Sequence, residues 1–307
     1  MSTKAKILDF MKLRGIASIL SIALVLGSVG ILAFKGLNFG LDFTGGTLIE
    51  VLYEDSVELQ NVRSSLSEAG YENAIVVNFG SDTDVLVRLP QGMSPTLGQE
   101  VLATLREDAN SEVELKRIEF VGPQVGEQLR EQGGLAVLLA LIVVLIYIAM
   151  RFQIKFAVGA VAALMHDVII TLGAFALVGW DFDLTVLAAI LAVIGYSLND
   201  TIVVADRIRE NLRKLRKQNP YDVVNISLTE TLDRTLATSG TTLMVLFALA
   251  FFGGEMIHSF ALALIIGIGV GTYSSIYIVA NLLLSMNISQ DDLIVIQKEG
   301  AEVDDLP

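Results

Sequence analysis

The stretch GIASILSIALVLGSVGILAF at residues 15–34 contains no charged side chain. A helix of about 20 apolar residues is long enough to cross the hydrocarbon core of a bilayer, which is about 30 Å thick. The 307-residue chain is 53% hydrophobic and has a mean hydropathy of +0.63, which soluble domains rarely reach. Five more long apolar runs lie near 134–150, 156–179, 184–205, 237–254 and 257–284. The sequence therefore predicts a membrane protein with six transmembrane helices.

The first apolar run resembles a secretory signal in one respect, because lysines and Arg14 precede it. It is longer than the apolar core of a signal, and no small-residue cleavage site follows it. We interpret 1–34 as a cytoplasmic N-terminus and a retained first membrane helix. The short loops 180–183 and 253–258 contain no Lys or Arg, whereas the opposite ends of the spans are basic. This bias predicts that both termini are cytoplasmic.

A polar segment, 35–133, separates the first two spans and contains 17 acidic against 7 basic residues. Its apolar pattern alternates as in strands or repeats as in helices, in the order β-α-β-β-α-β. The expected elements are 47–53, 56–70, 73–79, 83–89, 94–108 (opening on Ser94 and Pro95) and 112–121. This order is typical of a ferredoxin-like α+β domain. Because long acidic segments can be translocated, we expect the domain to be periplasmic.

The remaining chain is expected to hold transmembrane helices 2–6 within 134–284, with a basic cytoplasmic loop at 206–236 in which 207–219 is expected to be helical. An acidic cytoplasmic tail at 285–307 follows. A large insert after the first of six spans is the organisation of half a twelve-span transporter. Since the chain contains no internal repeat, the other half is expected to be a second chain, either a copy of this one or a paralogue.

Composition excludes several kinds of chemistry. The chain has no cysteine and two histidines, which rules out disulfides and Cys- or His-rich metal sites. It contains no phosphate-binding loop. A net charge of −13 is unfavourable for binding to the negatively charged backbone of a nucleic acid. Ser239, His166 and Asp167 are the residue types of a hydrolytic triad, but no nucleophile elbow accompanies them. We therefore expect no enzyme activity, no metal and no cofactor.

The fourth span carries a carboxylate, Asp200, within the sequence GYSLNDT. A charged carboxylate in a membrane helix is costly and marks functional sites. Tyr196 and Ser197 precede it by four and three residues and so share its helix face. With Asn199 and Thr201 they are predicted to form a polar cluster that binds an ion or a proton. The alternative is a helix-packing carboxylate, or one that water reaches from the cytoplasmic end.

Arg234 is the expected counter-charge of Asp200. It lies in TLDRTLATSGTT, which leads into the fifth span at the same predicted depth as Asp200. A nearby guanidinium stabilises an ionised carboxylate, and its withdrawal would favour protonation. The alternative is that Arg234 is one of the residues that orient the chain in the membrane.

Three more polar residues, Asp167, His166 and Asp42, lie within or next to predicted membrane spans. Asp167 is a second carboxylate within a span, and its neighbour His166 makes either a proton relay or a polar contact between packed helices possible. Asp42 lies in GLDFTGGT, at the exit from the first span. Gly45 and Gly46 in the same motif predict a tight turn in which Asp42 bonds backbone amides, as a structural joint.

Five motifs follow one another along the chain: GLDFTGGT, VGPQVGEQL, MHDVIIT, IGYSLNDTIVVADRIREN and LDRTLATSGTT. Together they resemble the SecF branch of the SecD/SecF family, protein-export membrane subunits of the RND-type transporter superfamily. The resemblance implies a SecD-like partner, association with the SecYEG translocon and a YajC-like subunit, and contact with translocating unfolded polypeptides. It also implies that a gradient of H⁺ or Na⁺ promotes late translocation across the bacterial inner membrane. In the family, the carboxylate here numbered Asp200 carries the ion and Arg234 regulates it.

Two other functions remain open from the residues. A half-size RND-like exporter would move lipids or small hydrophobic molecules, and would need a large apolar pocket in the exported domain. A non-transporting scaffold would only stabilise a translocon, and would tolerate the change Asp200→Asn.

Overall fold

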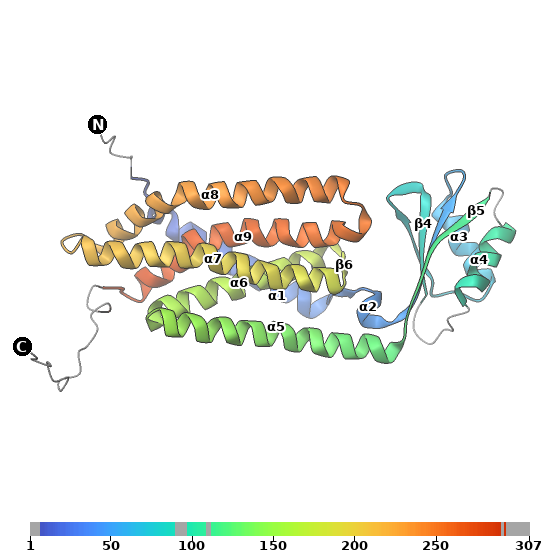
Figure 1. The fold of residues 1–307 in the computed structure, drawn as a ribbon, viewed down its shortest axis with the longest axis horizontal. Helices are drawn as coiled ribbons and strands as arrows, with labels where there is room; N and C mark the ends of the chain where they lie inside the picture. The colour runs from blue at the N-terminus through green and yellow to red at the C-terminus, as the bar shows by residue number, and fades with distance from the viewer. Residues whose placement is uncertain (1–6, 90–96, 109–111, 290–291, 293–307) are drawn as a thin grey trace, which may run out of the picture.

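The computed structural model describes residues 7–89, 97–108, 112–289 and 292. It is elongated, with a helical bundle at one end and a sheet domain at the other (Figure 1). The predicted Ser94–Pro95 helix start and most of the acidic tail at 285–307 lie outside the described residues.

Six helices of the described chain are long and apolar enough to cross a membrane, as predicted. The sixth of these helices along the chain is the central one, because it packs against four of the others. The third, fourth and sixth are the most buried, whereas the first, second and fifth leave much of their apolar surface exposed. The six are α1 (Arg14–Phe34), α5 (Pro123–Arg151), α6 (Ile154–Val178), α7 (Leu184–Lys214), α8 (Pro220–Phe252) and α9 (Glu255–Ser285).

A short 3-10 helix, η1 (Phe10–Leu13), precedes α1 and is fixed to the beginning of α8. The Oδ1 atom of Asp9 accepts hydrogen bonds from the Lys12 amide at 3.1 Å and from the Tyr221 hydroxyl at 2.8 Å. The Asn225 side chain donates to the same oxygen at 3.0 Å. The start of the chain's first span is therefore anchored at the end of the bundle farthest from the sheet (Figure 1).

The sheet domain has the predicted ferredoxin-like fold. Its four strands are antiparallel in the order β3-β4-β2-β5, and two helices join them. Ile49 lies opposite Val87 on one neighbouring strand and Ile118 on the other. Apolar side chains of the strands and helices close the core, and Ile49, Val87 and Leu66 are fully buried. The elements are β2 (Gly46–Tyr53), α3 (Leu59–Glu68), β3 (Ile75–Phe79), β4 (Ser81–Leu89), α4 (Leu97–Asp108) and β5 (Val113–Val121).

A joint connects the sheet domain to the bundle. Strand β1 (Asn38–Phe39) pairs in parallel with β6 (Asp181–Phe182), which lies between α6 and α7. The one-turn helix α2 (Leu41–Thr44) packs against α5. Part of the segment 35–133 thus belongs to the bundle side of the molecule. Helix α5 also begins at Pro123, well before the apolar run that starts near 134, so it runs continuously from the sheet into the bundle (Figure 1).

The predicted basic loop at 206–236 is helical over most of its length, so the connection between the two helices is short. Helix α7 continues to Lys214 and α8 begins at Pro220, so the connection covers only 215–219. Ion pairs of Glu210 with Arg207 and Lys214, three and four residues away, support the helical extension. The Asn219 side chain caps α8 by accepting from the Tyr221 amide.

Candidate functional site

Asp200 lies where α7, α8 and α9 meet. It is 3% exposed, and its Oδ2 atom accepts one hydrogen bond, from Ser239 Oγ of α8 at 3.4 Å. Ser239 in turn accepts from Thr272 Oγ1 of α9 at 2.8 Å. Among the described residues, no cation lies within 4.0 Å of the Asp200 carboxylate. The carboxylate is therefore buried, weakly bonded and without a direct counter-charge.

Arg234 lies on α8 with its side chain exposed, close enough to interact with Asp200 through its charge but not to form an ion pair. It lines a cavity of about 360 Å³ together with residues at the distal ends of α5, α7 and α8. In this cavity Arg207 bonds both Glu210 at 2.8 Å and Glu230 at 3.3 Å. The structure thus places Arg234 at the cavity, near Asp200 and not bonded to it.

Asp167 is the more completely bonded carboxylate of the bundle. It is 0% exposed, and its Oδ2 atom accepts from Ser197 Oγ of α7 at 2.5 Å and from Ser274 Oγ of α9 at 2.8 Å. Its Oδ1 atom lies 2.9 Å from Nδ1 of His166. A Cβ on Gly271 would lie 3.1 Å from the Ser197 Cβ, so the glycine allows α9 to lie close to α7 beside the carboxylate. Three helices converge on this one side chain.

The polar cluster predicted around Asp200 is divided in the structure. Ser197 is buried but donates to Asp167, and the Tyr196 hydroxyl lies 3.4 Å from Thr242 Oγ1 of α8. Asn199 is exposed, because successive residues of a helix point about 100° apart. Thr201 is 1% exposed, and its hydroxyl has no hydrogen-bond partner among the described residues.

The sequence reasoning missed the contribution of α9. Thr272 and Ser274 are the partners through which this helix reaches the two carboxylate sites. The run GTYSSIY at 271–277 is polar within an apolar span and is a signal that could have identified them. The structure also separates the residues of a hydrolytic triad, since Ser239 bonds Asp200 and not the His166–Asp167 pair.

The GLDFTGGT motif forms the joint between sheet and bundle. Asp42 Oδ2 accepts from the Leu184 amide at 3.0 Å, which satisfies an amide at the start of α7. Gly46 has φ +127, and a Cβ there would lie 2.3 Å from the Leu89 carbonyl oxygen. A Cβ on Gly126 of α5 would lie 2.8 Å from the Gly45 nitrogen. The two motif glycines, both with positive φ, therefore allow the chain to turn where Gly126 of α5 and Leu89 of β4 lie against it.

Arg88 of β4 connects the sheet to this joint. Its guanidinium donates to the Phe39 carbonyl at 2.6 Å and to Thr44 Oγ1 at 2.8 Å, and lies 3.9 Å from Asp181. Burial raises the pKa of the Asp181 carboxyl, while Arg88 and a hydrogen bond from Asn38 oppose that rise. One side chain of the sheet thus touches β1, α2 and β6.

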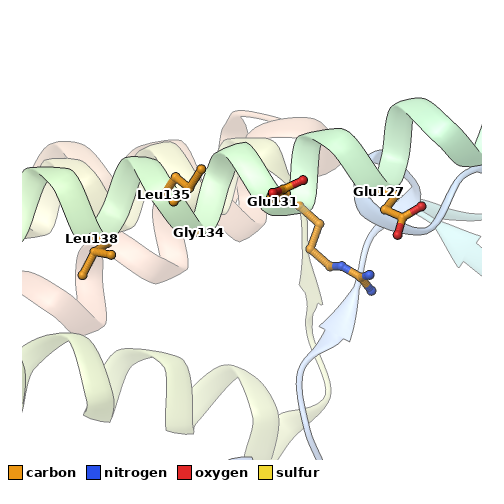
Figure 2. Close-up of a pocket in the computed structure, with 6 residues that line it drawn as sticks. Glu127, Glu131, Gly134, Leu135 and Leu138 are labelled. Carbon is orange, nitrogen blue, oxygen red and sulfur yellow. The ribbon is translucent and has the colours of Figure 1, made fainter.

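A cavity of about 530 Å³ lies far from Asp200, along α5 near the sheet. Figure 2 shows its lining residues Glu127, Glu131, Leu135 and Leu138 projecting from this single helix. Because all of its lining residues lie on α5, this feature is an open groove along one helix and not an enclosed cavity. In the described part of the chain, no three His, Cys, Asp or Glu side chains gather as a metal site would require.

Comparison with known proteins identifies related families and chains. Residues 101–289 match the family "Protein export membrane protein SecD/SecF, C-terminal", and residues 30–57 match "SecD/SecF GG Motif". The chain is 51% identical to the protein translocase subunit SecF of Vibrio alginolyticus, over 98% of each chain. It is 46% identical to that of Escherichia coli O157:H7, over 97% of this chain and 94% of the relative.

Solved structures give a second comparison. The fold matches SecDF, a translocon-associated membrane protein from Thermus thermophilus, with a TM-score of 0.85 and 38% identity. A structure of SecDF in a super-membrane-facing form matches with a TM-score of 0.70 and the same identity. Each match covers 94% of this chain, and the chain spans 40% of the length of the SecDF chains.

Proposed function

The chain belongs to the SecD/SecF family of protein-export membrane proteins, and we propose that Asp200 is the group through which an ion gradient drives it. The protein is an auxiliary subunit of the Sec protein-export machinery and a multi-pass protein of the bacterial inner membrane. Its relatives are transport components. The proposal concerns how this subunit obtains and uses energy.

The burial of Asp200 without a direct counter-charge carries the proposal. An ionised carboxylate in a membrane interior is costly, and the single Ser239 bond at 3.4 Å offsets little of that cost. Binding of H⁺ or Na⁺ would neutralise the charge, and no cofactor is needed. One charge that crosses a potential of 100 mV gains about 2.3 kcal/mol, which is comparable to a modest helix rearrangement.

Arg234 is proposed to regulate this site. Its exposed guanidinium lines the cavity at the distal end of α8 and interacts with Asp200 at a distance. When α8 moves toward α7, the positive charge favours the ionised carboxylate and release of the bound ion. When α8 moves away, the neutral, ion-loaded carboxylate is favoured. Movement of one helix would thereby couple ion binding to a change of shape.

The proposed partners follow from the family and from the size of the match. This chain spans 40% of SecDF, which supports a SecD-like partner that supplies the other half of a twelve-span unit. We propose association with SecYEG and a YajC-like subunit, and cytoplasmic N- and C-termini. The acidic sheet domain would then face the periplasm and contact the emerging polypeptide. Its closed core, in which Ile49, Val51 and Val87 are 0% exposed, offers little room for a lipid.

The proposal is tested with Asp200→Asn in the full-length chain, reconstituted with its SecD-like partner and the translocon. Export into vesicles is measured under an imposed pH gradient and then under an imposed Na⁺ gradient. We expect the variant to lose the gradient-dependent increase in export, at least tenfold, while ATP-driven export persists. Wild type should respond to only one of the two gradients, which identifies the ion.

Asp222→Asn is the matched control. Asp222 is exposed in the first turn of α8 and does not line the cavity that contains Arg234, so the same chemical change should leave gradient-dependent export near that of wild type. If Asp200→Asn also exports like wild type under both gradients, the coupling role is wrong. In that case a scaffold role, in which only the whole chain matters, is the better explanation.

A further inference from the structure

We propose that Asp167 and His166 together hold one proton, at a second protonation site in the bundle that is distinct from Asp200. The two side chains are 0% and 6% exposed, and their facing atoms, Oδ1 and Nδ1, lie 2.9 Å apart. The pair lies in the middle of α6, where bulk water does not reach it. This inference goes beyond the role proposed for Asp200, and it is argued from the contacts of the Asp167–His166 pair alone.

The charges around the pair require a proton for neutrality. Among the described residues, His166 is the only group within 4.0 Å that can give Asp167 a positive partner. On α9, Tyr273 stacks on the His166 ring with centroids 6.2 Å apart, and its hydroxyl donates to Ala17 of α1. On α7, the nearest ionisable residues are Tyr196, whose hydroxyl lies 3.4 Å from Thr242 Oγ1 of α8, and Asp200, one turn from Ser197.

The other two helices against α6 contribute no balancing charge at this level. Helix α1 has no ionisable residue after Arg14 at its beginning, and α5 has none between Glu131 and Tyr147. Without an added proton the pair would carry a full negative charge in a dry interior, which is strongly unfavourable. With one proton the pair is neutral, as either a carboxylate with an imidazolium or a carboxylic acid with a neutral ring.

The contacts favour a proton over a metal cation. The hydroxyls of Ser197 and Ser274 already donate to Oδ2 of Asp167, and Oδ1 faces a ring nitrogen. Na⁺ and similar hard cations bind through several oxygen ligands, and the ring nitrogen occupies the place of one of them. A proton needs no such ligand set, and it fits between Oδ1 and Nδ1 without any movement.

The outer nitrogen of His166 reports the state of the pair. Its Nε2 atom is buried and has no hydrogen-bond partner in the described chain. When the pair holds its proton, Nε2 carries hydrogen in both forms, since the ring is either doubly protonated or accepts at Nδ1. When the pair is empty, the carboxylate keeps the hydrogen on Nδ1 and Nε2 is bare.

The pair shares its supporting helices with Asp200. Ser197 and Asp200 lie three residues apart on α7, and Ser274 and Thr272 lie two apart on α9. A shift of α7 or α9 that lengthens the Ser197 or Ser274 bond would therefore disturb both carboxylates. This arrangement gives the bundle two protonation sites that respond to one movement.

The test is nitrogen NMR of the full-length chain, labelled with ¹⁵N at histidine and reconstituted in lipid bilayers. The chain has only two histidines, and His258→Gln removes the second signal. At neutral pH we expect Nε2 of His166 to carry hydrogen, and we expect Asp167→Asn to shift both ring signals. A bare Nε2 in the otherwise unchanged chain overturns the proposal without any variant that must fold.

Two further comparisons keep the proposal separate from the role of Asp200. Identical His166 signals in the Asp167→Asn variant would show that the carboxylate does not share its proton, and would also overturn it. Asp200→Asn should leave the protonation of His166 unchanged, as expected for a distinct site. Since the spectra do not depend on export, the pair can fail this test while gradient coupling at Asp200 stands, and the reverse also holds.

Discussion

The two carboxylates of the bundle differ in how many groups hold them. Asp167 faces three donors or ring nitrogens within 2.9 Å, whereas Asp200 has one hydroxyl at 3.4 Å. A fully bonded carboxylate is fixed in place, and a weakly bonded one is free to take a new ligand. This difference supports a fixed proton-holding site at the Asp167–His166 pair and an ion-exchange role for Asp200.

Gly46 offers a test of the joint at a single residue. Its backbone has φ +127, and a methyl group there would lie 2.3 Å from the Leu89 carbonyl oxygen. We expect Gly46→Ala to lower the free energy of unfolding by more than about 2 kcal/mol, since backbone strain and a clash with β4 combine. The measurement is the denaturant midpoint of the sheet domain in the full-length chain.

Gly70→Ala is the control for that change. Gly70 also has a positive φ, +93, but a Cβ there meets nothing within 4 Å. Its substitution should cost only about 1 kcal/mol, because it adds strain without a contact. Equal losses for the two variants would mean that the close approach of β2 to β4 is unimportant.

Hydrophobic pattern was enough to predict most helices and strands, because span length and alternation are local properties. The six spans and the β-α-β-β-α-β order appear in the structure, although α5 and α8 begin at Pro123 and Pro220, well before the apolar runs that start near 134 and 237. The end of α7 could not be read from hydrophobicity, because charged side chains end its apolar run without ending its helix. Lys214 and Glu210 instead stabilise that extension as a pair four residues apart.

The polar site was less predictable than the elements that carry it. Burial of Asp200 and Asp167 follows from their spans, but the partners of each come from other helices. Helical spacing assigned Ser197 to Asp200, whereas the crossing of α6 and α7 turns its hydroxyl toward Asp167. Which carboxylate a hydroxyl such as Ser197 Oγ bonds depends on how helices distant in sequence pack together.

Strand β2 carries a tyrosine that makes the sheet domain sensitive to alkaline pH. Tyr53 is 4% exposed, and burial raises its pKa from 10.0 to about 12. The unfolded chain ionises near pH 10 and the folded one near 12, so stability is complete below pH 10 and falls as pH rises between these values. The expected loss is about 2 to 3 kcal/mol by pH 12.

Denaturation of the full-length chain at pH 9 and pH 11 measures this effect, with Tyr53→Phe as the comparison. The phenylalanine variant should lose less stability between the two pH values, because it has no hydroxyl to ionise. An equal loss in both chains would assign the alkaline sensitivity to other groups.

In the whole molecule, motion in the bundle reaches the sheet domain through few connections. These are the β1–β6 pair, the Arg88 contacts with β1 and α2, and the continuous helix α5. Asp42 adds a bond from α2 to the first residue of α7, the helix that carries Asp200. Because β6 directly precedes α7, a shift of α7 would move β6 and change its contact with Arg88.

A reversible bond across the joint tests whether that motion is needed for export. Asn38 and Asp181 are register partners in the β1–β6 pair, and the chain has no other cysteine to interfere. In the double variant Asn38→Cys, Asp181→Cys, neighbouring positions of paired strands bring the two sulfur atoms within bonding reach. We expect oxidation to reduce gradient-dependent export severalfold and a reductant to restore it, with Asn38→Cys alone unaffected by oxidant. If the oxidised double variant exports like wild type, the joint does not open during the cycle, and coupling must pass through α5 instead.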